Sequence, residues 1–272
     1  MAVGTLAGQV ALVTGGGTGI GLACARAVHA DGATVVLTGR RADVLDDVVA
    51  AFGERAVAVV GDVADEDSMR ACVLRAEEMG RFTMCVANAG FGSAAPLFQT
   101  SLEQWQSVLA TNLTGAFLTV KHAGAAIVAA GGGSLVAISS IAGVATHRYM
   151  TPYCVSKAGV EMLVRNAADE LGAAGLRVNA VRPGLVPTDA TTGMLAVPAI
   201  VDDYLAQMPL GRTGTDNEVA SLVRFLLGSE SSWITGQCIG IDGGHHLRRG
   251  PDITPGIVFG YGQDAASGRV RP

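Results

Sequence analysis

Seven short apolar runs recur along this chain, and each has the length of a β-strand. Polar residues interrupt them little, which is typical of strands buried on both faces of a sheet. Valine and other β-branched residues, which favour strands, make up much of most runs. The runs lie at 9–14, 34–38, 56–60, 83–87, 134–138, 177–181 and 237–241.

Longer segments rich in helix-forming residues separate these runs. Strands that alternate with helices predict an α/β fold in which helices cover both faces of a parallel sheet. We therefore expect a doubly wound parallel sheet of about seven strands in a single domain. The expected helices cover residues 22–30, 42–52, 65–79, 102–130, 153–174 and 216–227.

Two segments lie outside this alternation. A long irregular stretch precedes the last expected helix, and a tail follows Gly243. The tail is rich in glycine, proline and arginine, a composition that argues against packed regular structure. We therefore divide the chain into a body of residues 1–244 and a C-terminal tail of residues 245–272.

Composition and charge exclude two classes of partner. The 272 residues include 49% hydrophobic and 16% charged side chains and carry a net charge of −5. Without a basic excess, neither nucleic acid nor an anionic membrane surface is an expected partner.

Residues 122–146 carry no formal charge, but glycines at 131–133 and serines at 139–140 interrupt them, so a helix-to-strand transition fits better than a membrane span. The first nine residues lack the features of a signal peptide, so we expect a cytoplasmic protein.

The five cysteines show neither a CxxC pair nor the spacing of metal ligands, so we expect no metal site. Cys24, Cys85 and Cys238 lie within apolar segments, where a reduced buried thiol is the usual state. Cys154 directly follows Tyr153 and stays open as an alternative nucleophile.

A glycine-rich turn follows the first expected strand and precedes the first expected helix. Residues 14–21 read TGGGTGIG, which is TGxxxGIG rather than GxGxxG. A strand, a glycine turn and a helix together place free backbone N–H groups and the helix dipole where they can bind a diphosphate. The alternative is a purely structural turn, but its position directly after the first strand favours binding.

Tyr153, Lys157 and Ser140 form the most informative set of polar residues. A phenol has a pKa of about 10 and is a poor general base at pH 7. Positions four apart share one face of a helix, so the Lys157 ammonium can lie beside Tyr153 and lower that pKa. The hydroxyl of Ser140 can then hydrogen-bond a substrate oxygen that the tyrosine protonates. Taken alone, a Tyr and a Lys four residues apart are most often an ordinary surface pair.

Seven motifs follow one another in order along the chain. They are TGxxxGIG at 14–21, Asp62-Val63, Ala87-Asn88-Ala89-Gly90, Asn112, Ser140, Tyr153-x-x-x-Lys157 and Pro183-Gly184. Their combination, over residues 8–244, resembles that of the short-chain dehydrogenase/reductase family. Ala87 departs from the pattern, because many members have an asparagine there that mostly stabilises the structure. The resemblance implies a Rossmann-like fold, hydride transfer between NAD(P) and a ketone/secondary alcohol pair, and assembly into homodimers or homotetramers.

The resemblance also assigns the cofactor contacts residue by residue. Asp62 and Val63 hold the adenine, Asn88 and Gly90 flank the ribose on the nicotinamide side, and Lys157 binds that ribose. The diphosphate is expected along the glycine turn, against Gly15, Gly17, Thr18, Gly19 and Ile20. The carboxamide is expected to contact two residues that follow the Pro183-Gly184 pair, Val186 and Thr188.

The catalytic set that the resemblance implies is Asn112, Ser140, Tyr153 and Lys157. Tyr153 exchanges the proton on oxygen and Ser140 polarises that oxygen. Asn112 lies inside an expected helix, where it can hold a water molecule for proton relay or be a core amide satisfied by neighbouring backbone. Residues 188–214 resemble the family's variable substrate lid and contain apolar side chains suited to an apolar pocket.

The choice between NADP and NAD depends on the end of the second expected strand. An acidic residue there binds the 2′-hydroxyl of NAD and repels a 2′-phosphate. This chain has Gly39 at that place, followed by Arg40 and Arg41. A missing carboxylate and a guanidinium that can bind a phosphate favour NADP, with Arg40 as the contact, and NAD stays open if both arginines are merely solvated.

The leading hypothesis is an NADP-preferring oxidoreductase of the ketoreductase kind, which acts on the ketone/secondary alcohol pair of a small-molecule carbonyl or alcohol substrate. The alternatives are an NAD-dependent alcohol dehydrogenase that works in the oxidative direction and a catalytically silent dinucleotide-binding protein. We also expect a homo-oligomer, because the helices at 102–130 and 153–174 carry more apolar surface than one sheet-facing side requires. The tail of residues 245–272 could then reach over a neighbouring subunit.

Overall fold

The computed structural model describes residues 6–248, 250 and 252–270. Seven strands form one sheet in the order β3-β2-β1-β4-β5-β6-β7, and all neighbouring strands pair in parallel. The expected doubly wound sheet of about seven strands is confirmed. The strands are β1 (Gln9–Thr14), β2 (Thr34–Gly39), β3 (Ala56–Val60), β4 (Arg81–Ala87), β5 (Gly133–Ile138), β6 (Leu176–Pro183) and β7 (Cys238–Ile241).

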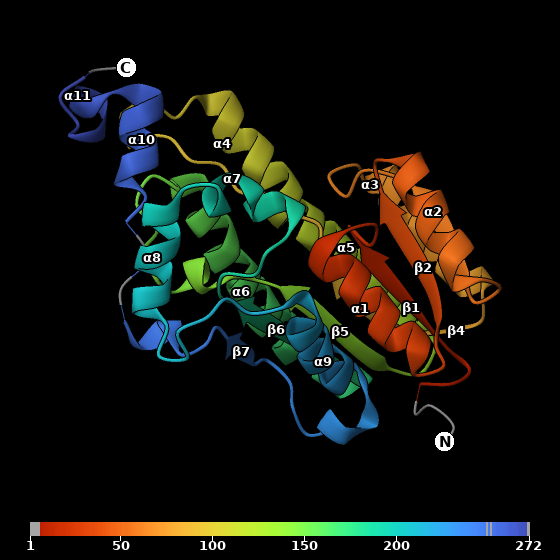
Figure 1. Ribbon diagram of the computed structural model, residues 1–272. Helices are drawn as coiled ribbons and strands as arrows, with labels where there is room; N and C mark the ends of the chain where they lie inside the picture. Colours follow the sequence, from red (N-terminus) through yellow and green to blue (C-terminus); the bar gives the residue numbers. More distant parts are fainter. Residues whose placement is uncertain (1–5, 249, 251, 271–272) are drawn as a thin grey trace.

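Helices cover both faces of this sheet (Figure 1). One hydrophobic core joins the sheet to α3 (Glu66–Glu78), α5 (Gly115–Ala129) and α6 (Thr151–Leu171). The other core joins it to three helices on the opposite face, in keeping with strands that are apolar on both sides. These helices are α1 (Gly19–Ala30), α2 (Ala42–Phe52) and α9 (Asp216–Leu227).

The strand order reverses direction between β1 and β4, which are neighbours in the sheet but not in sequence. In open parallel sheets, such a reversal leaves a crevice outside the carboxyl ends of the strands, because the following helices lie on opposite faces. The loops that follow β1, β4, β5 and β6 all meet at this edge and carry most of the residues singled out in the sequence.

The helix expected over residues 102–130 is interrupted. Helix α4 (Leu102–Leu109) passes into a π-helical turn at Ala110–Thr114 before α5 begins. Asn112 lies in this turn, where its Oδ1 accepts from the backbone N–H of Phe91 and its Nδ2 donates to the Phe91 carbonyl and to Ser156 Oγ. A π-turn is often found at functional sites, because it redirects a side chain out of the helical register.

Regular structure occurs where the sequence predicted none. The irregular stretch contains α7 (Thr192–Leu195) and α8 (Pro198–Gln207), and the tail contains α10 (Thr254–Tyr261) and α11 (Gln263–Ala266). The prediction of an unpacked tail was therefore wrong. Proline and glycine content misled it, since proline is tolerated in the first turn of a helix, as in α10. The tail packs through Ile253 and Ile257, which are both buried.

The uncharged stretch at residues 122–146 contains the end of α5, all of β5 and the loop beyond, as the interrupting glycines and serines indicated. Across the described part of the chain, no helix combines the length and the apolar character that crossing a bilayer requires.

Candidate active site

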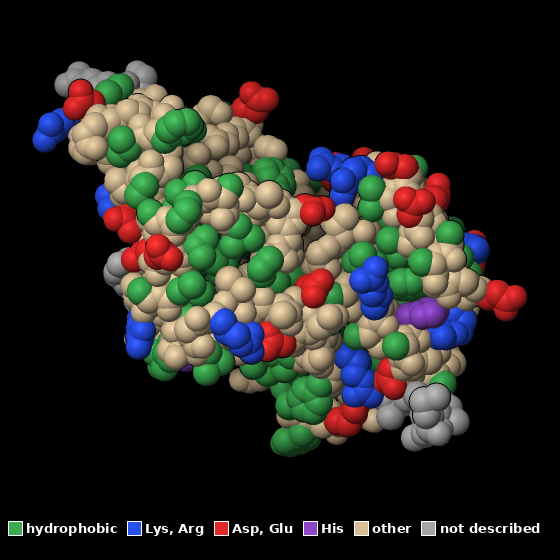
Figure 2. Space-filling model, viewed as in Figure 1, with side chains coloured by type: hydrophobic (Ala, Val, Ile, Leu, Met, Phe, Trp, Pro, Cys, Tyr) green, Lys and Arg blue, Asp and Glu red, His purple; other side chains and the backbone are tan. Residues whose placement is uncertain are grey.

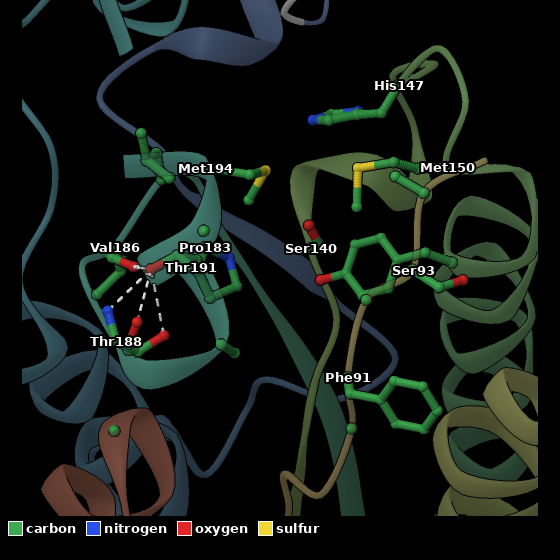
Figure 3. Close-up of a pocket in the computed structure, with 18 of the residues that line it drawn as sticks. Phe91, Ser93, Ser140, His147, Met150, Pro183, Val186, Thr188, Thr191 and Met194 are labelled. Atoms are coloured by element: carbon green, nitrogen blue, oxygen red, sulfur yellow. Dashed lines mark hydrogen bonds between the residues drawn. The ribbon is translucent and has the colours of Figure 1, made fainter. Parts of the chain in front are cut away.

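A cavity of about 540 Å³ opens at the carboxyl edge of the sheet. Its walls come from the glycine turn after β1, the loops after β4, β5 and β6, the segment with α7 and α8, and the C-terminal tail. Figure 2 shows hydrophobic side chains gathered over α7 and α8. Figure 3 shows Met194 and Met150 facing each other across the cavity, with Ser140 beneath Met150.

The glycine turn holds the backbone against the start of α1. Gly15 and Gly19 have positive φ angles of 62° and 52°, which residues with a Cβ seldom adopt. At Gly21, a Cβ would lie 2.2 Å from the Gly15 carbonyl oxygen. Helix α1 begins at Gly19, and the Thr18 side chain forms no capping hydrogen bond there. The first N–H groups of the helix therefore have no side-chain partner from Thr18, and their residues line the cavity. The turn therefore fits a diphosphate.

Asn88 ties the end of β4 to this turn. Its Nδ2 donates to the carbonyls of Thr14 and Gly15 at 2.9 and 3.2 Å. Thr14 Oγ1 in turn accepts from the backbone N–H groups of Asn88 and Ala89 at 2.9 and 3.1 Å. Asn88 is thus a structural brace as well as a wall of the cavity.

Ser140, Tyr153 and Lys157 converge on the cavity from two elements. Ser140 follows β5, and its Oγ accepts from the backbone N–H of Ala142 at 3.1 Å. Tyr153 lies in the first turn of α6 and is hydrogen-bonded to Ser140. Lys157, one turn later, donates from Nζ to the Ile138 carbonyl at 2.8 Å, and its Nζ lies 5.7 Å from the centre of the Tyr153 ring.

Burial dominates the acid–base properties of these groups. It raises the pKa of Tyr153, while the hydrogen bond with Ser140 acts in the opposite direction. Burial also lowers the pKa of Lys157 to about 8. The net shift of the phenol is therefore opposite to the one expected from Lys157 alone. In the protein without cofactor, Tyr153 keeps its proton at neutral pH and Lys157 is an ammonium below about pH 8.

A buried ion pair lies behind the catalytic groups. Glu161, one turn after Lys157 on α6, binds Arg182 of β6 through both carboxylate oxygens at 2.5 and 2.8 Å. Ser139 donates to the same carboxylate at 3.0 Å. Because Ser139 directly precedes Ser140 and Glu161 lies one turn after Lys157, this network joins α6 to the ends of β5 and β6 next to the catalytic residues.

The structure brings most of the expected site residues together. Those that line the cavity are Gly15, Thr18, Gly19, Ile20, Asn88, Gly90, Ser140, Tyr153, Lys157, Val186 and Thr188.

Five expected residues lie outside the cavity lining. Gly17 faces α2, since a Cβ there would lie 2.9 Å from Val44. Arg40 is exposed beyond the end of β2, and Asp62 accepts from the backbone N–H of Ala64 in a turn. Val63 and Asn112 border a packing gap that also reaches Lys157 but is too narrow to admit a water molecule.

Other residues of the site escaped the sequence analysis. The tail contributes Ile253, Ile257 and Tyr261 to the lining, and the four-residue spacing of the two isoleucines was the available signal. His147 lines the cavity, and its place in the loop between Ser140 and Tyr153 was a signal present in the sequence; Figure 3 shows its ring reaching over the cavity. Cys154 is not among the lining residues, and burial raises the pKa of its thiol, which argues against a nucleophilic role.

The comparisons with known proteins agree in matching this chain to reductases and dehydrogenases. Residues 15–246 match the family profile described as "Enoyl-(Acyl carrier protein) reductase". The cis-4-hydroxycyclohexanecarboxylate dehydrogenase of Sinomonas cyclohexanicum is 41% identical over 87% of this chain and 96% of its own length. A short-chain type dehydrogenase/reductase from Mycobacterium ulcerans is 38% identical, with a TM-score of 0.94 over 97% of this chain and 99% of its own. A gluconate 5-dehydrogenase from Burkholderia cenocepacia, in complex with NADP and tartrate, is 28% identical, with a TM-score of 0.87 over 91% of this chain and 100% of its own.

The buried ion pair leads to a prediction about stability. Glu161→Gln should lower the free energy of unfolding by about 3 kcal/mol, the lower end for a broken buried pair, because Arg182 is partly exposed. Urea denaturation measures this loss. Arg70→Gln, which breaks an exposed pair with Glu66, is the matched control and should leave the urea midpoint almost unchanged. Equal midpoints for the two variants would contradict the prediction.

Proposed function

Because this chain belongs to the short-chain dehydrogenase/reductase family, we propose that it reduces a ketone to a secondary alcohol with Tyr153 as the proton donor. The chain is an oxidoreductase that uses NAD(P) to interconvert alcohols and carbonyl compounds. The observation that carries the proposal is the convergence of Ser140, Tyr153 and Lys157 on one cavity that also contains the glycine turn. A silent dinucleotide-binding protein would not need all three side chains in this arrangement.

The nicotinamide cofactor supplies the hydride to the carbonyl carbon when it is bound. Ser140 Oγ polarises the carbonyl oxygen, and Tyr153 gives its phenolic proton to that oxygen. The Lys157 ammonium then stabilises the phenolate through charge. Asn112 would belong to this set as the residue that holds a water molecule for return of the proton. Both of its N–H groups have partners and its Oδ1 accepts from the Phe91 N–H, so that water would use the second lone pair of Oδ1.

The acid–base state of the site suits Tyr153 to the role of proton donor. Reduction requires a tyrosine that carries its proton, whereas oxidation requires a phenolate that accepts one. Burial raises the pKa of Tyr153 and so favours the donor role at neutral pH. The reverse reaction uses the same groups with Tyr153 as the base, and it becomes easier as the pH rises.

The glycine turn and its neighbours are suited to the cofactor. Gly15, Gly19 and the start of α1 would hold the diphosphate, and Gly17 would shape the turn between them. Asn88 and Gly90 would lie beside the ribose on the nicotinamide side, and Val186 and Thr188 beside the carboxamide. Asp62 and Val63 would flank the adenine. We propose NADP as the preferred form, with Arg40 as the contact to its 2′-phosphate.

Residues 1–244 would act as one dinucleotide-binding and catalytic unit, with residues 188–214 as its substrate lid. The body and the lid share the cavity: Met194, Val197 and Ile200 of the lid segment line it together with Tyr153 of the body. This arrangement supports the proposed division, because closure over the substrate would need only the lid to move.

Tyr153→Phe should remove most of the turnover and leave cofactor affinity nearly intact, because only the proton donor is lost. Acid–base assistance contributes a factor of about 10²–10⁴ in rate. Steady-state reduction of a ketone at 340 nm measures kcat, and fluorescence titration measures cofactor binding. Lys157→Ala is the comparison and should impair both, since Lys157 would contact both the phenolate and the ribose. A Tyr153→Phe variant with near-normal kcat would exclude Tyr153 as the donor.

NADP should bind at least about tenfold more tightly than NAD, because a charge-assisted hydrogen bond contributes about 1.5–3 kcal/mol. Arg40→Ala should remove most of that difference, and Gly39→Asp should reverse it by repelling the 2′-phosphate. The matched control is Arg26→Ala, which changes a guanidinium elsewhere on the surface of α1. Titration with both cofactors tests this, and equal affinity of the unaltered protein for both would refute the NADP preference.

We further propose a homodimer or homotetramer. Apolar side chains on α4, α5 and α6 are exposed, among them Leu102, Phe117 and Met162, and they would be buried by a second copy. Light scattering at micromolar concentration should therefore show more than one chain. Phe117→Glu combined with Met162→Glu should shift the protein toward the monomer, whereas Leu74→Glu on α3 should not. A monomeric unaltered protein would disprove the proposal.

A further inference from the structure

The C-terminal segment of residues 252–268, which we call the cap, folds over the cavity of its own chain. Ile253, Gly256, Ile257 and Tyr261 of the cap line that cavity. The family profile ends at residue 246, before the cap begins. Figure 1 shows α10 and α11 at the same end of the molecule as α7 and α8. The cap therefore adds a wall to the site that the matched family core does not supply.

The wall is apolar. The cap isoleucines belong to a third hydrophobic cluster, separate from the two cores that flank the sheet. Tyr153 and Met194 pack against this cluster, so it reaches from the cap to the side chain of the proton donor. Its buried members are Met150, Leu185, Ile200, Tyr204, Met208, Ile253 and Ile257.

The cavity offers little to a charged substrate. Among the described residues that line it, Lys157 is the single lysine or arginine, and it is already engaged with the Ile138 carbonyl. Burial lowers the pKa of His147, so its ring is neutral at pH 7. Asp189 is the one carboxylate in the described lining. A substrate carboxylate or phosphate would lose its hydration here without gaining a cationic partner.

Tyr149 fastens the cap to the catalytic loop. Within the described chain it is the one residue other than glycine with a positive φ, at 69°, a conformation that must be held by its surroundings. Its hydroxyl donates to the Ala266 carbonyl at 3.1 Å and lies 3.4 Å from Thr254 Oγ1. Arg148 also donates to Thr254 Oγ1, at 3.1 Å. Both ends of the cap are thus tied to the residues just before Tyr153.

We propose that the cap makes this enzyme selective for compact, uncharged, largely apolar ketones and secondary alcohols. Ile257 is the specificity-determining residue of the wall, and Tyr149 is a positioning residue that holds the cap in place. The cavity of about 540 Å³ must also take the nicotinamide end of the cofactor, which leaves room for a compact substrate. This inference rests on the proposed reduction of ketones by the same site.

The first test compares ketones matched in size. The holoenzyme should reduce 4-methylcyclohexanone with a kcat/KM at least about tenfold above that for 4-oxocyclohexanecarboxylate, which differs mainly in its charge. It should also prefer 4-methylcyclohexanone to the polyhydroxylated ketone L-tagatose. Preference for the charged or the polyhydroxylated ketone would overturn the inference.

The second test enlarges the wall. Ile257→Ala should raise the kcat/KM for 2-decalone relative to 4-methylcyclohexanone by about tenfold, because removed methyl groups make room for the second ring. Phe259→Ala is the matched control, since Phe259 lies on the same helix but is 96% exposed and does not line the cavity. The same ratio in both variants would show that the cap is not part of the substrate wall.

Tyr149→Phe removes the part of the fastening that the Tyr149 hydroxyl makes and leaves the lining and the Arg148 contact unchanged. The loss of one or two hydrogen bonds should raise KM for 4-methylcyclohexanone about fivefold, with kcat and cofactor affinity nearly unchanged. A merely structural role would lower thermal stability without this separation of KM from kcat. A KM equal to that of the unaltered enzyme would exclude Tyr149 as a positioning residue.

A binding measurement separates this inference from the proposed function. Calorimetric titration of each ketone into the protein with oxidised cofactor reports binding alone, since no hydride is available. Selective binding of 4-methylcyclohexanone to the complex with oxidised cofactor, without turnover in the complex with reduced cofactor, would support the apolar wall and disprove the proposed reduction of ketones. Turnover of other ketones without selective binding of 4-methylcyclohexanone would support the reduction and overturn the wall.

Discussion

The close approach of α1 to the turn before it is the constraint on which the site depends. At Gly21, a Cβ would lie 2.2 Å from the Gly15 carbonyl oxygen and 2.4 Å from Asn88 Nδ2, so a residue without a side chain is required. The same Asn88 amide bonds the carbonyls of Thr14 and Gly15, which joins the ends of β1 and β4. Because the strand order reverses between these two strands, that joint fixes the width of the crevice. The diphosphate end and the reacting end of the cavity are both placed relative to it.

Burial shifts the pKa values of the catalytic groups and raises the free energy of their charged forms. It disfavours the charged forms of both groups, so Tyr153 holds its proton more firmly than in water, whereas Lys157 loses its proton more readily. Such groups must be positioned by something rigid, because a small displacement loses much of the rate. The pair of Glu161 with Arg182 serves this purpose, since it fixes α6 to β6 one turn beyond Lys157, while Ser139 links the same carboxylate to the end of β5.

The sequence predicted what depends on local pattern. Runs of apolar residues gave the seven strands and their parallel arrangement, and the four-residue spacing of Tyr153 and Lys157 placed both on one helical face. It could not predict what depends on distant contacts. The π-turn at Asn112 leaves no periodic signal, and the direction in which Gly17 faces depends on how α2 packs. The helix α10 is short and contains proline and two glycines, so it depends on its packing against the third cluster and on the hydrogen bonds to Thr254.

The cap connects recognition of the substrate to the chemistry. Apolar walls exclude water, and the hydrogen bond that Ser140 can give to a developing negative charge is stronger where water is excluded. The same cap is fastened through Tyr149, four residues before Tyr153, so the wall and the proton donor are held by neighbouring parts of one loop. The cap acts on how well a substrate binds, whereas the position of Tyr153 is fixed by α6 itself. Selectivity should therefore appear in KM, and the rate of proton transfer should depend on the groups of α6 and β5.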